Sequence, residues 1–272
     1  MEPHLIVIAL ALAALVGVSL GLLGGGGSIL TVPILTYVLG MPPREAIAAS
    51  LFIVGVTSAV GAITHARAGR VRWKMGVIFG LAGMVGAFGG GLLGGFIPGA
   101  VLMVLFAVMM IVTAIAMIRG RRGKGSGGGK GSGEDPRPAE AHETPLPLAR
   151  ILLDGFVVGL ATGLVGAGGG FLIVPALNLL GGLTMAVAVA TSLLVITMKS
   201  FAGLAGYLFS VQLNWPIVLA FTATAVAGSF VGVKLAGHIP ERALRKGFGI
   251  FVLVMGAFVL VQEVPVILAP LF

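Results

Sequence analysis

The chain has 272 residues, of which 58% are hydrophobic and only 10% are charged, a composition that excludes an ordinary soluble domain and indicates an integral membrane protein. The absence of cysteine excludes disulfides, thiolate metal sites and cysteine nucleophiles, and the four scattered histidines have no metal-ligand spacing, so we expect neither a cofactor nor an enzyme. The net charge of +8 comes mostly from short loops and from residues 119–150, as expected of cytoplasmic loops rather than of a nucleic-acid-binding surface.

Ten apolar stretches, five in each half of the chain, predict an all-α polytopic membrane protein. Most contain about the 20 residues that a helix needs to cross a hydrocarbon core of about 30 Å. Two stretches of about 13 residues would rise only about 20 Å, and we expect short broken or re-entrant helices there. In chain order the stretches cover 5–23, 28–40 (short), 45–66, 75–95, 99–118, 151–165, 169–182 (short), 186–210, 216–236 and 247–268.

The polar segment in the middle of the chain predicts two membrane domains. Residues 119–150 are rich in glycine, serine and charged side chains, so we expect a flexible cytoplasmic linker. The first transmembrane repeat is then 1–118 and the second is 151–272. The first apolar stretch has no lysine or arginine before it, so we expect it to belong to the mature protein rather than to a signal peptide.

The two halves repeat each other. Residues 21–33, GLLGGGGSILTVP, recur at 163–175 as GLVGAGGGFLIVP, a spacing of 142 residues that also relates Trp73 to Trp215. Duplicated halves of membrane proteins usually face each other across a pseudo-two-fold axis, with a small-molecule site where broken helices meet. The duplication therefore predicts a transporter.

Lysine and arginine gather at 67–74, in the linker and at 238–246, and all three clusters should be cytoplasmic. If each short segment crosses the membrane, five passes per half place all three inside, place both termini outside and make the repeats inverted, which we favour. If the short segments only dip in and return, four passes per half make the repeats parallel and leave the last cluster outside.

The glycine runs before the short segments are candidate substrate-binding residues. Glycine permits positive φ and close approach of a ligand. The first amides of a following helix lack internal partners and carry partial positive charge, which suits an anion. The alternative is that these glycines only permit tight helix packing. The candidates are Gly24, Gly25, Gly26, Gly27 and Ser28 in the first half, and Gly166, Gly168, Gly169 and Gly170 in the second.

Lys199 lies near the middle of the 186–210 stretch, which contains no acidic residue. An ammonium group there is costly unless it faces a cavity or a partner, so it suits an anionic substrate. Snorkelling to the interface and pairing with Asp154 are the alternatives. Hydroxyl groups could add donors, although many such groups bond only to their own helix. Those we expect at the site are Thr191, Ser192 and Ser200. The matching positions of the first half are Ser50, Thr57 and Ser58, where Thr57 replaces the lysine.

The doubled glycine motif that ends in proline, with the alanine-rich stretches 46–51 and 188–193 behind it, resembles the TauE/SafE family of sulfite exporters. The resemblance covers nearly the whole chain except the linker. It implies a multi-pass permease of the cell membrane that moves sulfite, organosulfonates or related sulfur anions, and we expect secondary transport by alternating access. The expected partners are that anion and the lipid bilayer, with a homodimer left open. An anion channel on the same fold and a non-transporting scaffold or accessory subunit are the alternatives.

Overall fold

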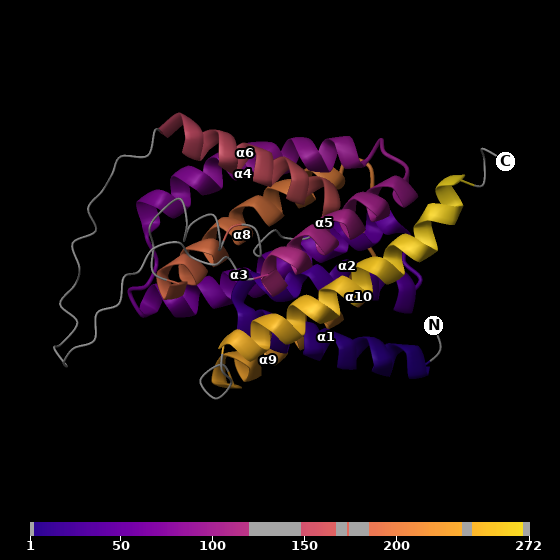
Figure 1. Cartoon of the computed structure of the whole chain (residues 1–272), viewed down its shortest axis with the longest axis horizontal. Helices are drawn as coiled ribbons and strands as arrows, with labels where there is room; N and C mark the ends of the chain where they lie inside the picture. The colour runs from indigo at the N-terminus through magenta and orange to yellow at the C-terminus, as the bar shows by residue number, and fades with distance from the viewer. Residues whose placement is uncertain (1–2, 120–147, 167–172, 174–184, 236–240, 269–272) are drawn as a thin grey trace.

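The computed structural model describes residues 3–119, 148–166, 173, 185–235 and 241–268. In these residues all regular structure is helical, as the sequence predicts, and long helices lie side by side along the longest axis of the molecule (Figure 1). The elements are α1 (Pro3–Leu23), the 3₁₀ helix η1 (Gly24–Leu30), α2 (Thr31–Pro33), the π-helix η2 (Ile34–Val38), α3 (Pro43–Arg67), α4 (Trp73–Gly94), α5 (Gly99–Arg119), α6 (Leu148–Val165), α8 (Met185–Tyr207), α9 (Trp215–Leu235) and α10 (Glu241–Leu268).

Four of the described helices are long and apolar enough to cross a membrane, namely α3, α4, α8 and α9. Shorter apolar stretches lie in α1, α5, α6 and α10. Large apolar side chains such as Val85, Phe230 and Val254 are exposed on the outside of the bundle, where a water-soluble protein would carry polar groups. These features confirm the predicted multi-pass membrane location.

Glycines bring α4 and α6 together at backbone distance. A methyl group at Gly86 or Gly90 of α4 would overlap the backbone of α6. Likewise, a methyl group at Gly159 or Gly163 of α6 would overlap the backbone of α4. The contacts advance in the same direction along both helices, so α4 and α6 are parallel. The successive pairs are Phe79 with Gly155, Gly83 with Gly159, Ala87 with Gly163 and Gly90 with Leu164.

α1 and α9 form a second parallel pair of the same kind. The successive contacts include Gly17 with Ala225 and Gly21 with Ser229. Shifting each of these residues by the repeat spacing of 142 gives the α6–α4 contacts of Gly159 with Gly83 and of Gly163 with Ala87. The two interfaces therefore use the same sequence positions with the two halves exchanged.

α3 and α8, which occupy matching positions in the sequence repeat, cross in opposite directions. The contacts pair Leu51 with Gly203, Gly55 with Ser200, and Gly61 with Leu193. The first and last of these pairs also exchange under the repeat spacing. α8 also packs parallel to α4, where Gly91 of α4 lies against the backbone of Gly203.

These contacts fix the directions of the helices. The short turns 68–72 and 208–214 reverse the chain between α3 and α4 and between α8 and α9. Consequently α1, α3 and α9 run one way, and α4, α6 and α8 run the other. Because α1 and α3 run in the same direction, residues 24–42 carry the chain back along the bundle between them.

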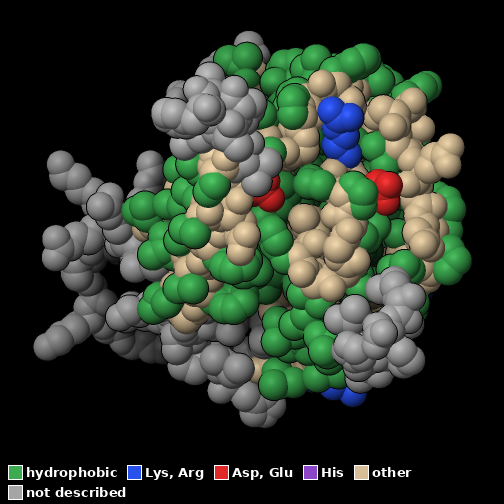
Figure 2. All heavy atoms as spheres, turned by 90° about the vertical axis from the view of Figure 1, so that its right-hand side faces the viewer, with side chains coloured by type: hydrophobic (Ala, Val, Ile, Leu, Met, Phe, Trp, Pro, Cys, Tyr) green, Lys and Arg blue, Asp and Glu red, His purple; other side chains and the backbone are tan. Residues whose placement is uncertain are grey.

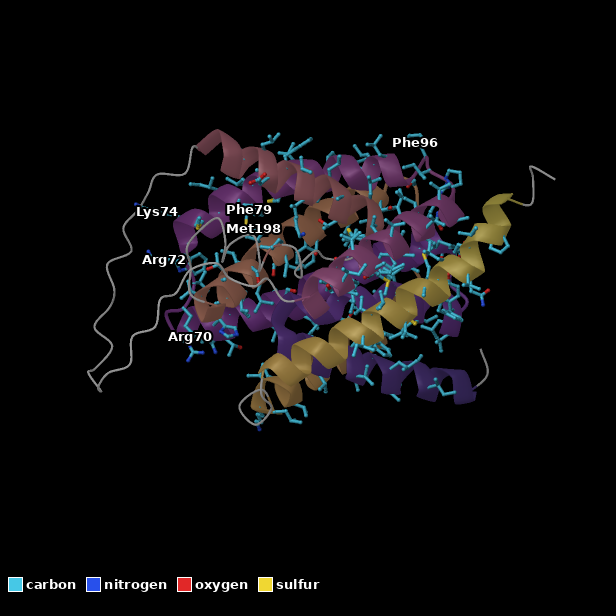
Figure 3. The ribbon with its side chains drawn as sticks, in the orientation of Figure 1. Arg70, Arg72, Lys74, Phe79, Phe96 and Met198 are labelled. Atoms are coloured by element: carbon cyan, nitrogen blue, oxygen red, sulfur yellow. The ribbon has the colours of Figure 1, made fainter. Side chains whose placement is uncertain are left out.

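The two ends of the bundle differ in chemistry. Arg70, Arg72 and Lys74 lie at one end, and Phe96 lies at the other (Figure 3). The beginning of α1 and the end of α10 lie toward this same end of the bundle (Figure 1). Viewed directly, that end shows mainly apolar side chains and few charged groups (Figure 2).

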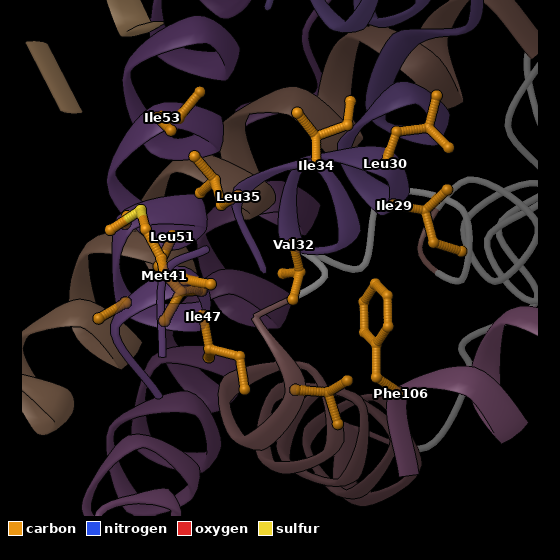
Figure 4. Close-up of a cluster of buried hydrophobic side chains, with 14 of the residues drawn as sticks. Ile29, Leu30, Val32, Ile34, Leu35, Met41, Ile47, Leu51, Ile53 and Phe106 are labelled. Carbon is orange, nitrogen blue, oxygen red and sulfur yellow. The ribbon is translucent and has the colours of Figure 1, made fainter. Parts of the chain in front are cut away.

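The apolar core surrounds the short segment between α1 and α3, which consists of η1, α2 and η2. Ile29, Leu30, Val32 and Leu35 from this segment are buried and lie near Phe106 of α5 (Figure 4). Side chains of α3, among them Ile47 and Leu51, complete the cluster shown there. The segment between α1 and α3 is thus an integral part of the core.

Candidate functional site

The first glycine run is helical. Residues 24–27 lie in η1, which follows α1 directly, and a 3₁₀ helix has negative φ. These glycines therefore do not use the positive φ that glycine permits. A methyl group on Gly27 would overlap the backbone of Ser19 and Leu20 near the end of α1, so close packing explains that glycine. Ser28 beside it is fully buried.

The second break is different. α6 ends at Val165, and Gly166 has a φ of 72°, which favours glycine. Its amide donates to the Thr162 carbonyl oxygen at 3.0 Å. A methyl group on Gly166 would approach Ile47 Cγ2 of α3 to 2.7 Å. Both the backbone angle and the close approach of α3 require glycine here. The candidates Gly168, Gly169 and Gly170 lie outside the described residues.

The last carbonyl oxygens of α6 have no partner within the helix, and side chains from both halves of the sequence donate hydrogen bonds to them. Ser50 Oγ of α3 donates to the Gly166 carbonyl oxygen at 2.9 Å. Tyr207 Oη of α8 donates to the Leu164 carbonyl oxygen at 2.5 Å. The sequence does not predict a role for Tyr207, whose ring fits because Gly94 of α4 has no side chain. The end of α6 is therefore a junction of α3, α4 and α8.

Lys199 is the most buried charged group of the described residues, with 2% of its surface exposed. Its Nζ donates to Thr162 Oγ1 of α6 at 2.9 Å, and that hydroxyl donates in turn to the Val158 carbonyl oxygen at 2.7 Å. Gly83 of α4 also faces the lysine, because a methyl group there would lie 3.9 Å from Lys199 Cβ. The ammonium thus lies between α4, α6 and α8 and does not snorkel to an interface. Its recorded partner within the described residues is Thr162 and not Asp154.

Thr162 was not predicted as a site residue. It lies one turn, or about 6 Å along the axis, before Gly166, so Lys199 and Ser50 meet the same helix end at successive turns. A helix C-terminus carries partial negative charge, which favours a nearby ammonium. The part of the chain that the structure describes has no group of three or more histidine, aspartate or glutamate side chains that could hold a metal ion.

The remaining predicted hydroxyls do not converge on this junction. Thr57 Oγ1 donates to the Ile53 carbonyl oxygen of its own helix, and Ser192 Oγ donates to the Val189 carbonyl oxygen at 2.7 Å. Thr191 Oγ1 accepts the Arg72 amide at 3.1 Å, at the turn between α3 and α4. Ser200 Oγ is buried without a hydrogen-bond partner among the described residues. The structure therefore brings together Ser50, Gly166 and Lys199, whereas the hydroxyls of Thr57, Thr191, Ser192 and Ser200 make no hydrogen bond to the end of α6 among the described residues.

Known protein sequences match this chain along almost its whole length. The family model described as "Sulfite exporter TauE/SafE" matches residues 9–259. A "Probable membrane transporter protein" of Xylella fastidiosa is 35% identical over 259 residues, covering 94% of this chain and 95% of that protein. Another of that description, from Methanocaldococcus jannaschii, is 30% identical over 270 residues, covering 92% and 95%. A search of solved structures gave no match.

Proposed function

The chain belongs to the sulfite exporter TauE/SafE family of membrane proteins, and from this premise we propose that it carries small sulfur oxyanions, such as sulfite or organosulfonates, by alternating access. Its relatives are named as membrane transporters, and the apolar helices agree with that class. The identity of the solute and the transport cycle are our inference from the residues at the end of α6.

The observation that carries this proposal is the buried ammonium of Lys199. Its recorded partner is one neutral hydroxyl, that of Thr162, so its charge has capacity for an anion. An unneutralised charge at membrane depth is costly and is retained mainly for function. A compact oxyanion would gain a charge-assisted hydrogen bond here that a neutral solute would not.

We further propose that the two halves are inverted repeats. The exchanged contacts of α1 with α9 and of α6 with α4 are those that a two-fold relation between the halves generates. α3 and α8 are equivalent helices that cross in opposite directions, so the axis relating them runs across the helices and lies in the membrane plane. Parallel repeats would instead align equivalent helices in the same direction.

Alternating access also needs parts that move against each other. The α1–α9 and α4–α6 pairs are locked by backbone contacts of glycine, whereas α3 meets α8 largely through side chains. We infer that the locked pairs move as units and that the α3–α8 crossing adjusts. The hydrogen bonds of Ser50 and Ser192 differ although the two positions are equivalent. That difference fits a transporter held in one of its two access states.

The experiment that tests the proposed solute is binding to the purified protein, measured as an increase in its thermal unfolding temperature. We expect sulfite and methanesulfonate to stabilise the wild type, because a ligand at 100 times its Kd adds about 2.7 kcal/mol. Acetate should stabilise it less. Lys199→Met should strongly reduce the effect, whereas Lys234→Met, at the exposed end of α9, should keep it. A wild type that no sulfur oxyanion stabilises would contradict the proposal.

A further inference from the structure

We propose that Ser58 and Ser200 form a second anion-binding position, located where α3 crosses α8. This proposal deepens the proposed function and rests on it. Ser58 has no role in the site at the end of α6, and Ser200 points away from that site toward α3. The position would be shared equally by the two halves of the sequence.

The hydroxyl groups of Ser58 and Ser200 are buried and have no hydrogen-bond partner among the described residues. Ser58 is 1% exposed and Ser200 is fully buried, and neither Oγ has a hydrogen-bond partner among the described residues. A serine in a helix can usually donate to a carbonyl three or four residues earlier, and an unpaired buried hydroxyl is unfavourable. The other buried hydroxyls of the described long helices do have partners; they belong to Ser50, Thr57, Thr113, Thr162, Thr191, Ser192, Thr222 and Ser229.

Ser58 and Ser200 occupy equivalent positions in the two halves of the sequence. Ser58 and Ser200 are related by the repeat spacing of 142 residues, so each half contributes one unpaired hydroxyl at the same position. Ser58 lies one turn from Gly55 and one turn from Gly61, the two glycines through which α3 meets α8. Ser200 lies directly opposite Gly55. The two serines thus belong to one interface and flank its centre.

α3 and α8 meet through side chains, which can shift, and not through their backbones. A methyl group added to Gly55 would lie 3.4 Å from Ser200 Cβ and from the Phe201 ring, which is ordinary van der Waals contact. At Gly86, in the interface of α4 with α6, the same methyl group would overlap backbone atoms. Methyl groups added at Gly55, Gly61 or Gly203 would meet side chains of the opposite helix at 3.2–3.4 Å and not its backbone, which distinguishes the α3–α8 crossing from the locked pairs.

The chemistry of the position follows from its donors. Two hydroxyl groups from opposing helices suit a ligand with several equivalent acceptor oxygens, as in sulfite or a sulfonate group. Lys199 is the neighbour of Ser200 in α8, but its side chain faces α4 and α6. α8 therefore presents a cation on one face and a hydroxyl on the next, and an anion leaving Lys199 would find donors at the crossing.

The test is a binding titration with radiolabelled sulfite on purified wild type, Ser58→Ala, Ser200→Ala and the double variant. Because loss of a hydrogen bond to a charged group weakens binding by about tenfold, we expect about a tenfold increase in Kd for each single variant. Gly55→Ala, which fills the space beside Ser200, should weaken binding similarly. Ser229→Ala in α9 is the matched control, because the Ser229 hydroxyl donates a hydrogen bond to the Val226 carbonyl oxygen of its own helix. The Kd of this variant should equal that of the wild type.

Thermal unfolding without anion separates this position from a merely structural role. Removing an unpaired buried hydroxyl should leave the unfolding temperature of Ser58→Ala and Ser200→Ala unchanged or raise it. Wild-type affinity in both serine variants, or a lowered unfolding temperature in both, would overturn this proposal while leaving the proposed function intact. Absence of sulfite binding to the wild type would overturn both proposals, and wild-type affinity in Lys199→Met would remove only the ammonium site.

Discussion

At the scale of single residues, the hydrogen bonds of the candidate site lie on the last two turns of α6. Thr162 Oγ1 accepts a hydrogen bond from the Lys199 ammonium, and the Gly166 carbonyl oxygen accepts one from the Ser50 hydroxyl. The sequence predicts Lys199, Ser50 and Gly166, because a lysine within an apolar stretch and a repeated glycine motif are visible in one dimension. It does not predict Thr162 or Tyr207, because their importance depends on which helix lies opposite them.

Ser50 provides a residue-scale prediction. Ser50→Ala should lower the free energy of unfolding by about 1–2 kcal/mol, because it leaves the buried Gly166 carbonyl oxygen without this donor. Ser192→Ala is the matched comparison, since Ser192 occupies the equivalent position but bonds its own helix, and it should cost less. Thermal or denaturant unfolding in detergent measures both values. Equal losses in the two variants would show that the Ser50 hydrogen bond has no special role.

At the scale of elements, composition and periodicity predict the long helices well. The predicted stretch 45–66 is α3 (Pro43–Arg67), and 75–95 is α4 (Trp73–Gly94), with ends displaced by about two residues. The first short segment is predicted as a break but not as consecutive 3₁₀, α and π turns, because these depend on packing against α1 and α5. The second, at 169–182, lies almost wholly outside the described residues.

The α4–α6 interface gives the prediction at this scale. Gly86→Ala should destabilise the protein by about 1–3 kcal/mol, because its methyl group would overlap the α6 backbone at Phe156. Gly89→Ala on the same helix is the control. Its methyl group would lie 3.9 Å from Leu160 Cδ1, and alanine favours a helix over glycine by about 1 kcal/mol. Unfolding of both variants in the same detergent tests the interface, and a Gly86→Ala protein as stable as Gly89→Ala would contradict it.

At the scale of the whole molecule, the helix directions predict opposite membrane faces for two equivalent turns. The chain contains no cysteine, so single cysteines can be introduced at the exposed residues Ala68 and Gln212. Ala68 lies in the basic turn between α3 and α4, which should be cytoplasmic, and Gln212 lies in the turn between α8 and α9. In intact cells, an impermeant thiol reagent should label Gln212→Cys, and should label Ala68→Cys only after permeabilisation. Labelling of both from one side would support parallel repeats instead.

The repeat at 142 residues and the basic clusters predict the inverted arrangement from the sequence, and the exchanged contacts Gly17–Ala225 and Gly159–Gly83 support it. The sequence does not predict that equivalent serines behave differently, as Ser50 and Ser192 do. Which acceptor each serine reaches depends on the helix that lies opposite it, and the sequence alone does not give that neighbour.

The central claim is that Lys199 binds a sulfur oxyanion that the protein carries across the membrane, and counterflow tests it most directly. Proteoliposomes loaded with unlabelled sulfite are placed in a trace of labelled sulfite, and the label inside is followed with time. We predict a transient, saturable accumulation with the wild type and with Lys234→Met, and a rate at least about tenfold lower with Lys199→Met, since a charge-assisted hydrogen bond is lost. Undiminished counterflow with Lys199→Met, or a wild type that passes label only down its gradient without saturation, would contradict the account.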